Sequence, residues 1–151
     1  MKAVLQRVTR AQVTVDDRVT GAIGPGLCVL VGAVKGDTEV DADFIAKKLA
    51  TVRVFHDDEG KMNRSVLDTG GKLLVVSQFT LAAETTSGTR PSFSNALPPT
   101  QAEPLIEYLV GRLEERGLSV EQGEFGALMS VELCNQGPVT IILDSKNKVR
   151  K

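Results

Sequence analysis

The chain has 151 residues, of which 42% are hydrophobic and 25% are charged, and its formal net charge is -1. This composition is typical of a folded globular protein and excludes a disordered one. The near-zero net charge excludes a polybasic binder whose affinity rests on a strongly positive chain, but it leaves room for a nucleic-acid ligand held by a local patch. At this length we expect one domain spanning residues 1–151.

The sequence carries no signal for a membrane, a metal or a disulfide framework. No stretch approaches the roughly 18–20 apolar residues of a membrane span, and the first residues lack the apolar core of a signal peptide. Cys28 and Cys134 form no C-x-x-C pair, and Cys28 lies in an apolar run that predicts a buried, unreactive thiol. The single His56 cannot supply a multi-histidine zinc site. We expect a cytoplasmic protein with no cofactor, no metal and no membrane partner.

The first part of the chain has the alternating pattern of half-buried strands. Strands are expected at residues 2–8, 11–15, 19–23 and 27–34, the last of them buried on both faces. Asp16-Asp17 predicts a turn before the third strand, and Gly24-Pro25-Gly26 suits a type II turn before the fourth. The chain therefore opens as a β-meander.

Two main helices are predicted farther along. The first is capped by Asp37 or Thr38, and its apolar face comprises Ala42, Ile45, Ala46, Leu49 and Val52. The second is expected to begin at a capping box formed by Thr100 and Glu103 and to end near Gly117. Further strands are expected at residues 73–77, 118–121, 131–133 and 139–143. This order predicts an α+β domain with a curved, β-barrel-like sheet and its helices on one side.

The common catalytic motifs are absent from the sequence. It contains no G-x-x-x-x-G-K-[ST] phosphate loop, no G-x-S-x-G nucleophile elbow and no H-E-x-x-H zinc motif. A Ser-His pair could run only through His56, which lies in the polar stretch HDDEGK that is typical of an exposed turn. We therefore do not expect a Ser-His site.

The segment Ser77-Gln78-Phe79-Thr80-Leu81 lies at the end of a predicted buried strand. Polar groups at such a strand end are where a scaffold often displays its chemistry. From the residues alone, the alternative is that Ser77 and Thr80 cap the strand and Gln78 faces solvent.

A second candidate segment is Asn135-Gln136-Gly137-Pro138-Val139-Thr140. The bond before a proline is the only kind with an appreciable cis population, and two consecutive carbonyls could be presented here to a ligand amine. The alternative is an ordinary turn between two strands. Between the two candidate segments, Arg90 offers a cation for phosphate and Phe93 an apolar anchor.

Several motifs together resemble the D-aminoacyl-tRNA deacylase family, also called D-tyrosyl-tRNA deacylases. They are SQFTL at 77–81, NQGPVT at 135–140, GEFGALM at 123–129, the opening QRVTRAQVTVD, IGPGLCVLVG and DEGKMNRSVLD. They occur in the family's order and cover essentially the whole chain. On its sequence the chain is identified as a member of this family.

The resemblance implies an activity, an assembly and partners. Members of the family hydrolyse the ester that joins a D-amino acid, or glycine, to the terminal adenosine of tRNA, and they leave L-aminoacyl-tRNA alone. Their fold is a homodimer of β-barrel-like subunits with active sites at the subunit interface. The implied partners are a tRNA charged with a D-amino acid or glycine and a second copy of the chain.

The resemblance also assigns site residues. Gly137-Pro138 is similar to the family's Gly-cisPro element, which one subunit inserts into the pocket of the other. The catalytic segment Ser77, Gln78, Phe79 and Thr80 is similar to the segment that lines this pocket. Phe125 and Met129 are similar to residues that pack around the terminal adenine. Arg90 and Arg7 are expected to contact tRNA.

This arrangement would select chirality by exclusion. If the substrate α-amino group donates to the Gly137 and Pro138 carbonyls while Ser77–Thr80 holds the ester carbonyl, a D side chain points outward and an L side chain into protein. Glycine has no side chain and passes. The resemblance favours water as nucleophile, helped by the ribose 2′-hydroxyl. The backbone N–H groups of Phe79 and Thr80 are candidate donors to the oxyanion. By its position Thr80 is a candidate nucleophile, but no base in the sequence is placed to deprotonate it, so a positioning role is favoured.

One departure from the family concerns the stretch between SQFTL and RPSF. Family members often carry more basic residues there, whereas this chain has AAETTSGT. Fewer cations predict weaker contacts with the tRNA backbone and more dependence on Arg90, Arg7 and Lys61. Two other functions stay open: a nucleic-acid-binding module without activity, and a related deacylase that acts on mischarged L-amino acids through an altered Gly-Pro geometry.

Overall fold

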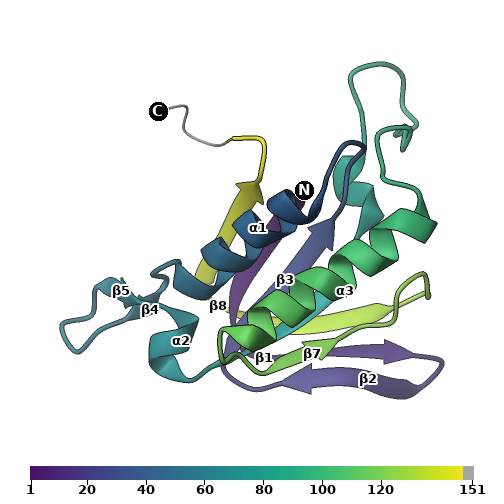
Figure 1. Cartoon of the computed structure of the whole chain (residues 1–151). Helices are drawn as coiled ribbons and strands as arrows, with labels where there is room; N and C mark the ends of the chain where they lie inside the picture. Colours follow the sequence, from purple (N-terminus) through teal and green to yellow (C-terminus); the bar gives the residue numbers. More distant parts are fainter. Residues whose placement is uncertain (148–151) are drawn as a thin grey trace.

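The structure, a computed structural model that describes residues 1–147, has the α+β fold that the sequence predicts (Figure 1). Its main sheet contains β1 (Lys2–Val15), β2 (Arg18–Ile23), β3 (Gly26–Gly32), β6 (Lys72–Ser77), β7 (Val120–Gln122) and β8 (Ser130–Asp144). A separate hairpin pairs β4 (Phe55–His56) with β5 (Met62–Arg64). The helices are α1 (Glu39–Thr51), α2 (Val66–Thr69), α3 (Pro99–Glu115) and the 3-10 turn η1 (Phe79–Ala82).

The long strand β1 organises the sheet. Its first half pairs with β3 and its second half with β2, both antiparallel, while β8 pairs along almost the whole of its length. β6 joins β3 in parallel, and β7 joins β6 in parallel. The strands predicted at 2–8 and 11–15 are one strand, because Arg10 pairs with Cys134 and keeps the ladder to β8 continuous. The curved sheet that results is barrel-like.

The main core lies between the sheet and the two long helices. It contains fully buried aliphatic side chains from both layers: Leu5, Leu27, Val29, Leu73, Ile45, Leu49, Leu109 and Leu113. A smaller cluster, which includes Val13, Cys28 and Leu74, fills the other side of β3 and β6. Burial on both faces of β3 is therefore confirmed. Burial also raises the pKa of the Cys28 thiol to about 11, which keeps it neutral and unreactive.

The helix starts test two capping predictions. Thr38 is the N-cap of α1, and its N–H donates to the Asp41 carboxylate at 3.0 Å, so one of the two proposed caps is confirmed. The capping box predicted at Thr100 and Glu103 is wrong, because the N-cap of α3 is Pro98 and the helix begins at Pro99, two residues before the start that a Thr100 cap implies. A proline suits the first helical position, since it lacks the N–H that this position leaves without an acceptor.

β8 contains the largest departure from the predicted elements. The strands predicted at 131–133 and 139–143 belong to one strand that bulges in its middle. Gln6 pairs with Thr140 and Val8 pairs with Asn135, so Arg7 alone lies opposite residues 136–139. The extra residues are pushed out of the ladder. An ordinary turn between two strands is therefore not what this segment forms.

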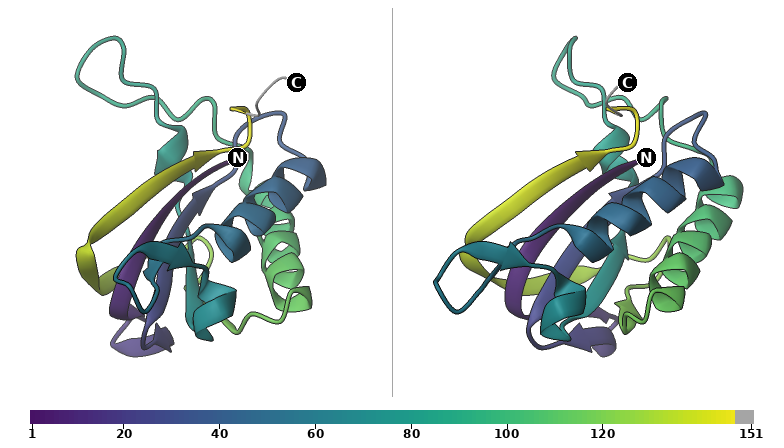
Figure 2. Two further views of the ribbon diagram at one scale, coloured as in Figure 1. Left: turned by 90° about the vertical axis from the view of Figure 1, so that its left-hand side faces the viewer. Right: turned by 60° about the vertical axis from the view of Figure 1, so that its left-hand side comes forward.

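The helices α1 and α3 cover the same side of the sheet, and the outer face of β8 has no helix over it (Figure 2). Two segments project from this body: the β4–β5 hairpin, which carries the exposed His56, and the long loop between η1 and α3 (Figure 1). Within residues 1–147, no helix is both long and apolar enough to cross a membrane.

Candidate functional site

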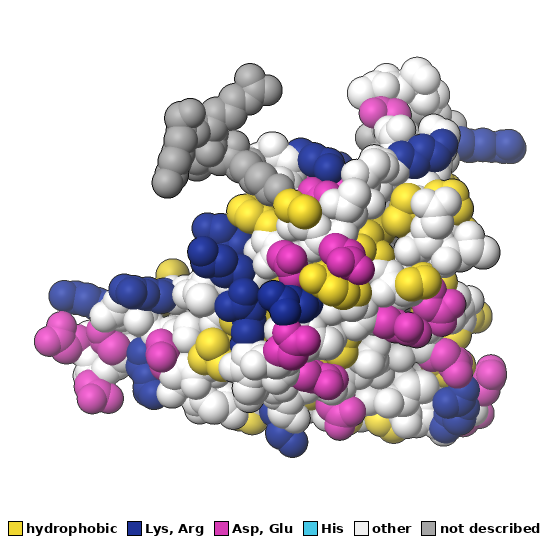
Figure 3. All heavy atoms as spheres, viewed as in Figure 1, with side chains coloured by type: hydrophobic (Ala, Val, Ile, Leu, Met, Phe, Trp, Pro, Cys, Tyr) yellow, Lys and Arg dark blue, Asp and Glu magenta, His cyan; other side chains and the backbone are white. Residues whose placement is uncertain are grey.

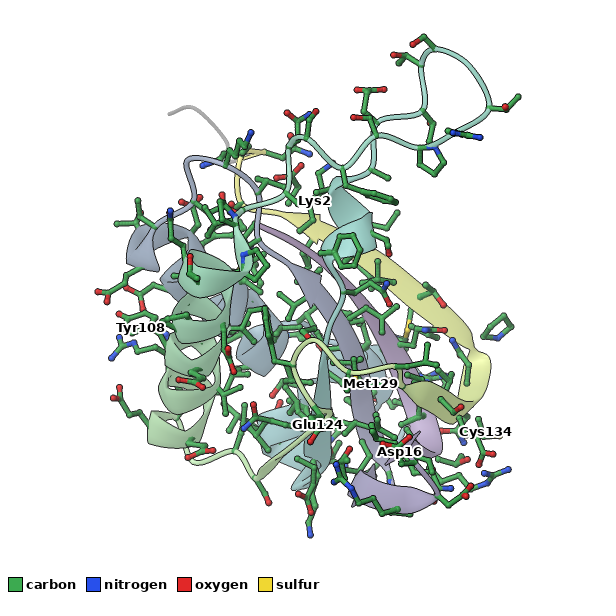
Figure 4. The ribbon with its side chains drawn as sticks, turned by 90° about the vertical axis from the view of Figure 1, so that its right-hand side faces the viewer. Lys2, Asp16, Tyr108, Glu124, Met129 and Cys134 are labelled. Carbon is green, nitrogen blue, oxygen red and sulfur yellow. The ribbon has the colours of Figure 1, made fainter. Side chains whose placement is uncertain are left out.

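A pocket of about 320 Å³ opens where the end of β6 meets α3 and the segment between β7 and β8. Ser77, Gln78 and Phe79 contribute to its lining, and so do Phe125 and Met129. The apolar remainder includes Leu97, Ala102, Ile106, Leu128 and Val131. The structure therefore brings most of the predicted catalytic segment together with the two predicted adenosine-contacting residues, although their roles stay predictions. Figure 4 shows Met129 and Glu124 on the segment that leads from β7 into β8.

The lining of this pocket contains no ionisable side chain among the described residues. Its side-chain polar groups are the Ser77 hydroxyl and the Gln78 amide. Neither group is a base near neutral pH. The polar groups of this lining are therefore main-chain groups and these two side chains.

A second hollow, of about 270 Å³, adjoins the pocket and shares Ser77 and Phe125 with it. It is lined by the three carboxylates of Glu103, Glu107 and Glu124. Acidic side chains also appear over α3 in the space-filling view (Figure 3). Glu124 forms an ion pair with Arg18 at 2.9 Å, and the negative charge of Glu103 and Glu107 disfavours phosphate groups on this side of the site.

The position of Gln78 depends on a glycine in the neighbouring strand. The Gln78 N–H donates to the Val31 carbonyl at 2.7 Å, after which the chain turns into η1. A Cβ atom on Gly32 would lie 2.5 Å from the Gln78 carbonyl oxygen, so only glycine allows this approach. The role of Gly32 was not predicted from the sequence. The one feature that could have indicated it is a glycine at the end of a buried apolar strand.

Thr80 lies beside the pocket but does not contribute to its lining. Its hydroxyl oxygen accepts a short hydrogen bond from the side-chain amide of Gln78. An amide N–H is a donor and cannot take a proton from the hydroxyl. This hydrogen bond therefore does not supply the general base that a covalent nucleophile needs.

Phe79 lines the pocket although its side chain is 59% exposed. Its ring packs edge-on against the ring of Phe93, with 5.1 Å between centroids and 73° between planes. Phe93 belongs to the projecting loop between η1 and α3, as does Arg90. Arg90 is exposed and lies outside the pocket lining.

Gly137 and Pro138 lie at the bulge of β8, exposed, and are absent from the lining of the pocket in the same chain. The peptide bond between them is cis. Gly137 has a φ of 142°, and a Cβ there would lie 2.8 Å from the Val139 Cγ2 atom. This position therefore requires glycine. One chain alone does not bring the two predicted motifs together.

Two side chains hold this bulge from behind. Arg7 is 5% exposed; its Nε donates to the Gln136 carbonyl at 2.9 Å and its Nη1 to the Val54 carbonyl at 2.6 Å. The Asn135 amide spans the bulge, since its Oδ1 accepts the Val139 N–H at 2.7 Å and its Nδ2 donates to the Val139 carbonyl at 3.1 Å. Arg7 was expected to contact tRNA; its position instead turns it inward to two main-chain carbonyls.

Comparisons with known proteins agree with the resemblance. The model of the family described as D-Tyr-tRNA(Tyr) deacylase matches residues 4–144. A D-aminoacyl-tRNA deacylase of Roseiflexus castenholzii is 58% identical over 145 residues, which cover 96% of this chain and 92% of that protein. Another, of Ruegeria pomeroyi, is 58% identical over 144 residues, which cover 95% and 99%.

Solved structures show the same fold. A c-Myc DNA unwinding element binding protein superposes with a TM-score of 0.90 at 42% identity, over 95% of this chain and 98% of that one. A probable eukaryotic D-amino acid tRNA deacylase has a TM-score of 0.79 at 16% identity, over 94% and 97%, and supports the fold alone. With the family model matched over nearly the whole chain, the protein belongs to the D-Tyr-tRNA(Tyr) deacylase family.

Proposed function

We propose that this protein is a D-aminoacyl-tRNA deacylase, a hydrolase that cleaves the ester between a D-amino acid, or glycine, and the terminal adenosine of tRNA and rejects the L ester. The observation that carries the proposal is the pocket in which Ser77–Phe79 and Phe125–Met129 meet without an ionisable side chain. An aminoacyl ester is already reactive. Oriented N–H donors and a positioned water are therefore enough to hydrolyse it.

The apolar part of the pocket suits the terminal adenosine. Phe125 offers an aromatic ring and Met129 a polarisable thioether, and both kinds of side chain pack well against a base. The adjoining hollow with Glu103, Glu107 and Glu124 disfavours phosphates. The tRNA backbone would therefore leave the pocket on the other side, toward the loop that carries Arg90.

Hydrolysis would rely on the main chain at η1. The N–H groups of Phe79 and Thr80 begin this turn, where intrahelical acceptors are missing. One such donor aimed at an oxyanion contributes about 2.7–4 kcal/mol to the transition state. The attacking water would be oriented by the ribose 2′-hydroxyl of the substrate. Thr80, whose hydroxyl accepts from Gln78, would have a positioning role.

Selection between enantiomers would come from the carbonyls of Gly137 and Pro138. They would accept hydrogen bonds from the substrate α-ammonium group while η1 holds the ester carbonyl, which fixes two substituents of the α-carbon. A D side chain then points to solvent, whereas an L side chain clashes with the protein. Glycine has no side chain that could clash. Exclusion of this kind admits many D side chains with one site.

The selecting carbonyls would belong to a second copy of the chain. Gly137 and Pro138 do not line their own pocket, which supports this assembly. Ile142 is 76% exposed on β8, whose outer face carries no helix (Figure 2). An exposed aliphatic side chain on an uncovered strand suits an interface between copies. A two-fold dimer would place each bulge at the pocket of the other copy.

The proposed function is tested by deacylation of D-Tyr-tRNA, L-Tyr-tRNA and Gly-tRNA by the purified, chelator-treated protein. We expect fast release of D-tyrosine and glycine and no release of L-tyrosine above the spontaneous rate. Release of L-tyrosine alone would favour the related deacylase for mischarged L-amino acids. Release from none of the three, with tRNA still bound, would favour a nucleic-acid-binding module.

A further inference from the structure

Phe93 lies on the projecting loop, and its ring contacts the ring of Phe79, which lines the pocket. The Phe79 ring is 59% exposed and the Phe93 ring 39% exposed, so neither is buried in the core. An edge-to-face pair at 5.1 Å lies within the favourable range for aromatic rings. The Phe93 ring therefore supports the Phe79 ring from the side of the projecting loop.

The loop backbone holds Phe93 in place from both sides. Before it, Glu84 and Ser92 exchange two main-chain hydrogen bonds of 2.8 and 2.9 Å, which close the base of the loop. After it, the Phe93 carbonyl accepts the Ala96 N–H at 3.0 Å, and the Asn95 carbonyl accepts the Lys35 N–H at 2.8 Å. The ring is thus presented to Phe79 by a loop that is closed at its base and hydrogen-bonded to Lys35, in the segment that follows β3.

We propose that Phe93 is a positioning residue for hydrolysis: its ring fixes the Phe79 ring and, through it, the turn η1 that forms the hydrolytic wall of the pocket. Phe93 does not line the pocket and would not touch the reacting atoms. Its effect should therefore appear in turnover rather than in tRNA affinity. This inference rests on the proposed function, because it assigns Phe79 to the hydrolytic wall.

The test compares steady-state deacylation of D-Tyr-tRNA, over a range of substrate concentrations, by the wild type, Phe93→Ala and Phe93→Tyr. We expect Phe93→Ala to lower kcat about ten- to a hundredfold, as a misplaced reacting group does, with KM and the unfolding midpoint little changed. Phe93→Tyr keeps the ring and should recover most of the wild-type rate. Met62→Ala, which trims another exposed side chain on the distant β4–β5 hairpin, should leave turnover unchanged.

An NMR measurement separates the contact from the catalysis. Phe79 ring protons should shift in Phe93→Ala, because the ring current of Phe93 is lost, and stay near their wild-type positions in Phe93→Tyr. Wild-type turnover by Phe93→Ala would overturn the proposal, and so would a change confined to KM or an equal loss in both variants. If the wild type itself releases no D-tyrosine, the proposed function fails, whereas the NMR shifts still report the contact.

Discussion

Asn135 shows how one side chain can shape a main-chain recognition element. Its side-chain amide accepts a hydrogen bond from the Val139 N–H and donates one to the Val139 carbonyl, so it connects the two ends of the Gly137–Pro138 bulge. Arg7 acts from the other strand on the carbonyl of Gln136. If selection uses carbonyl groups, these two side chains set the direction in which the carbonyls point.

Replacing Asn135 by alanine should loosen that bulge. Four hydrogen bonds of the Asn135 side chain are lost, two of them to the main chain of Val139. The free energy of unfolding should therefore fall by about 1–3 kcal/mol, and the ratio of D-Tyr-tRNA to L-Tyr-tRNA hydrolysis should fall as well. Gln12→Ala removes an exposed side-chain bond to Glu132 between the same two strands and serves as the control. If Asn135→Ala hydrolysed D-Tyr-tRNA and L-Tyr-tRNA in the wild-type ratio, the shape of the bulge would not depend on the Asn135 side chain.

Replacing Gly32 by alanine should move the hydrolytic segment without touching its residues. The new methyl group would lie 2.5 Å from the Gln78 carbonyl oxygen, so the chain at Gln78 must shift. We expect a large fall in kcat for D-Tyr-tRNA. Gly111→Ala is the matched control, because nothing lies within 4 Å of its Cβ position in α3 and alanine should stabilise that helix by roughly 0.5–1 kcal/mol. Full activity in Gly32→Ala would contradict this role for the close approach.

At the scale of elements, the start of α1 is tied to the end of β8 through Asp41. The Asp41 carboxylate accepts from the Thr38 N–H, from the Ser145 hydroxyl at 2.7 Å and from the Lys146 ammonium at 3.1 Å. Burial by itself would raise the pKa of Asp41, but these hydrogen bonds outweigh it and hold the pKa well below the ordinary value of 3.8. The charged form therefore stabilises the contact between the two elements.

A depressed carboxyl pKa determines the sign of a pH effect on stability. The stabilisation is fully present above the unfolded-state pKa of about 4 and is lost as the pH falls toward the folded-state value. The free energy of unfolding should therefore decrease below about pH 4, and Asp41→Asn should show a shallower decrease. Urea unfolding of both proteins between pH 2 and 7 gives these slopes, with Asp16→Asn in the exposed β1–β2 turn as control. Equal slopes in the wild type and Asp41→Asn would contradict the assignment.

At the scale of the whole molecule, the sequence predicted individual helices and strands better than the contacts between residues that are distant in the chain. The patterns that gave α1, α3 and most strands are local, so they could be recognised without the partner strands. The continuity of β1 and β8 depends on pairing between distant residues, which is why each was predicted as two strands. The inward role of Arg7 was equally out of reach, because its acceptors lie 47 and 129 residues away.

For the site as well, the residues within motifs could be predicted from the sequence, whereas the residues that act through contacts between strands could not. SQFTL and GEFGALM could be assigned to one site from the family resemblance, and the structure places Ser77–Phe79 and Phe125–Met129 in one pocket. The roles of Gly32 and Asn135 depend on an approach between neighbouring strands and on the shape of a bulge. Neither feature leaves a periodic or compositional signal, so residue patterns alone could not reveal them.

The proposed dimer gives a prediction for the outer face of β8. A lysine in place of Ile142 would put a charge into the interface, so Ile142→Lys should sediment as a monomer and lose deacylation of D-Tyr-tRNA. Val19→Lys on β2 changes a side chain of similar exposure, 56%, and should leave sedimentation and activity unaffected. A fully active monomeric Ile142→Lys would mean that each chain forms a complete site.

The most direct test of the central claim, that one copy supplies the selecting carbonyls to the pocket of the other, mixes two inactive variants. Ala127→Phe should fill the pocket, and Gly137→Val should distort the bulge. After subunit exchange in equal amounts, half of the dimers carry one intact composite site, so the mixture should recover about a quarter of the wild-type rate on D-Tyr-tRNA. No recovery from dimers shown to be mixed would contradict the claim, because pocket and selector would then belong to the same chain.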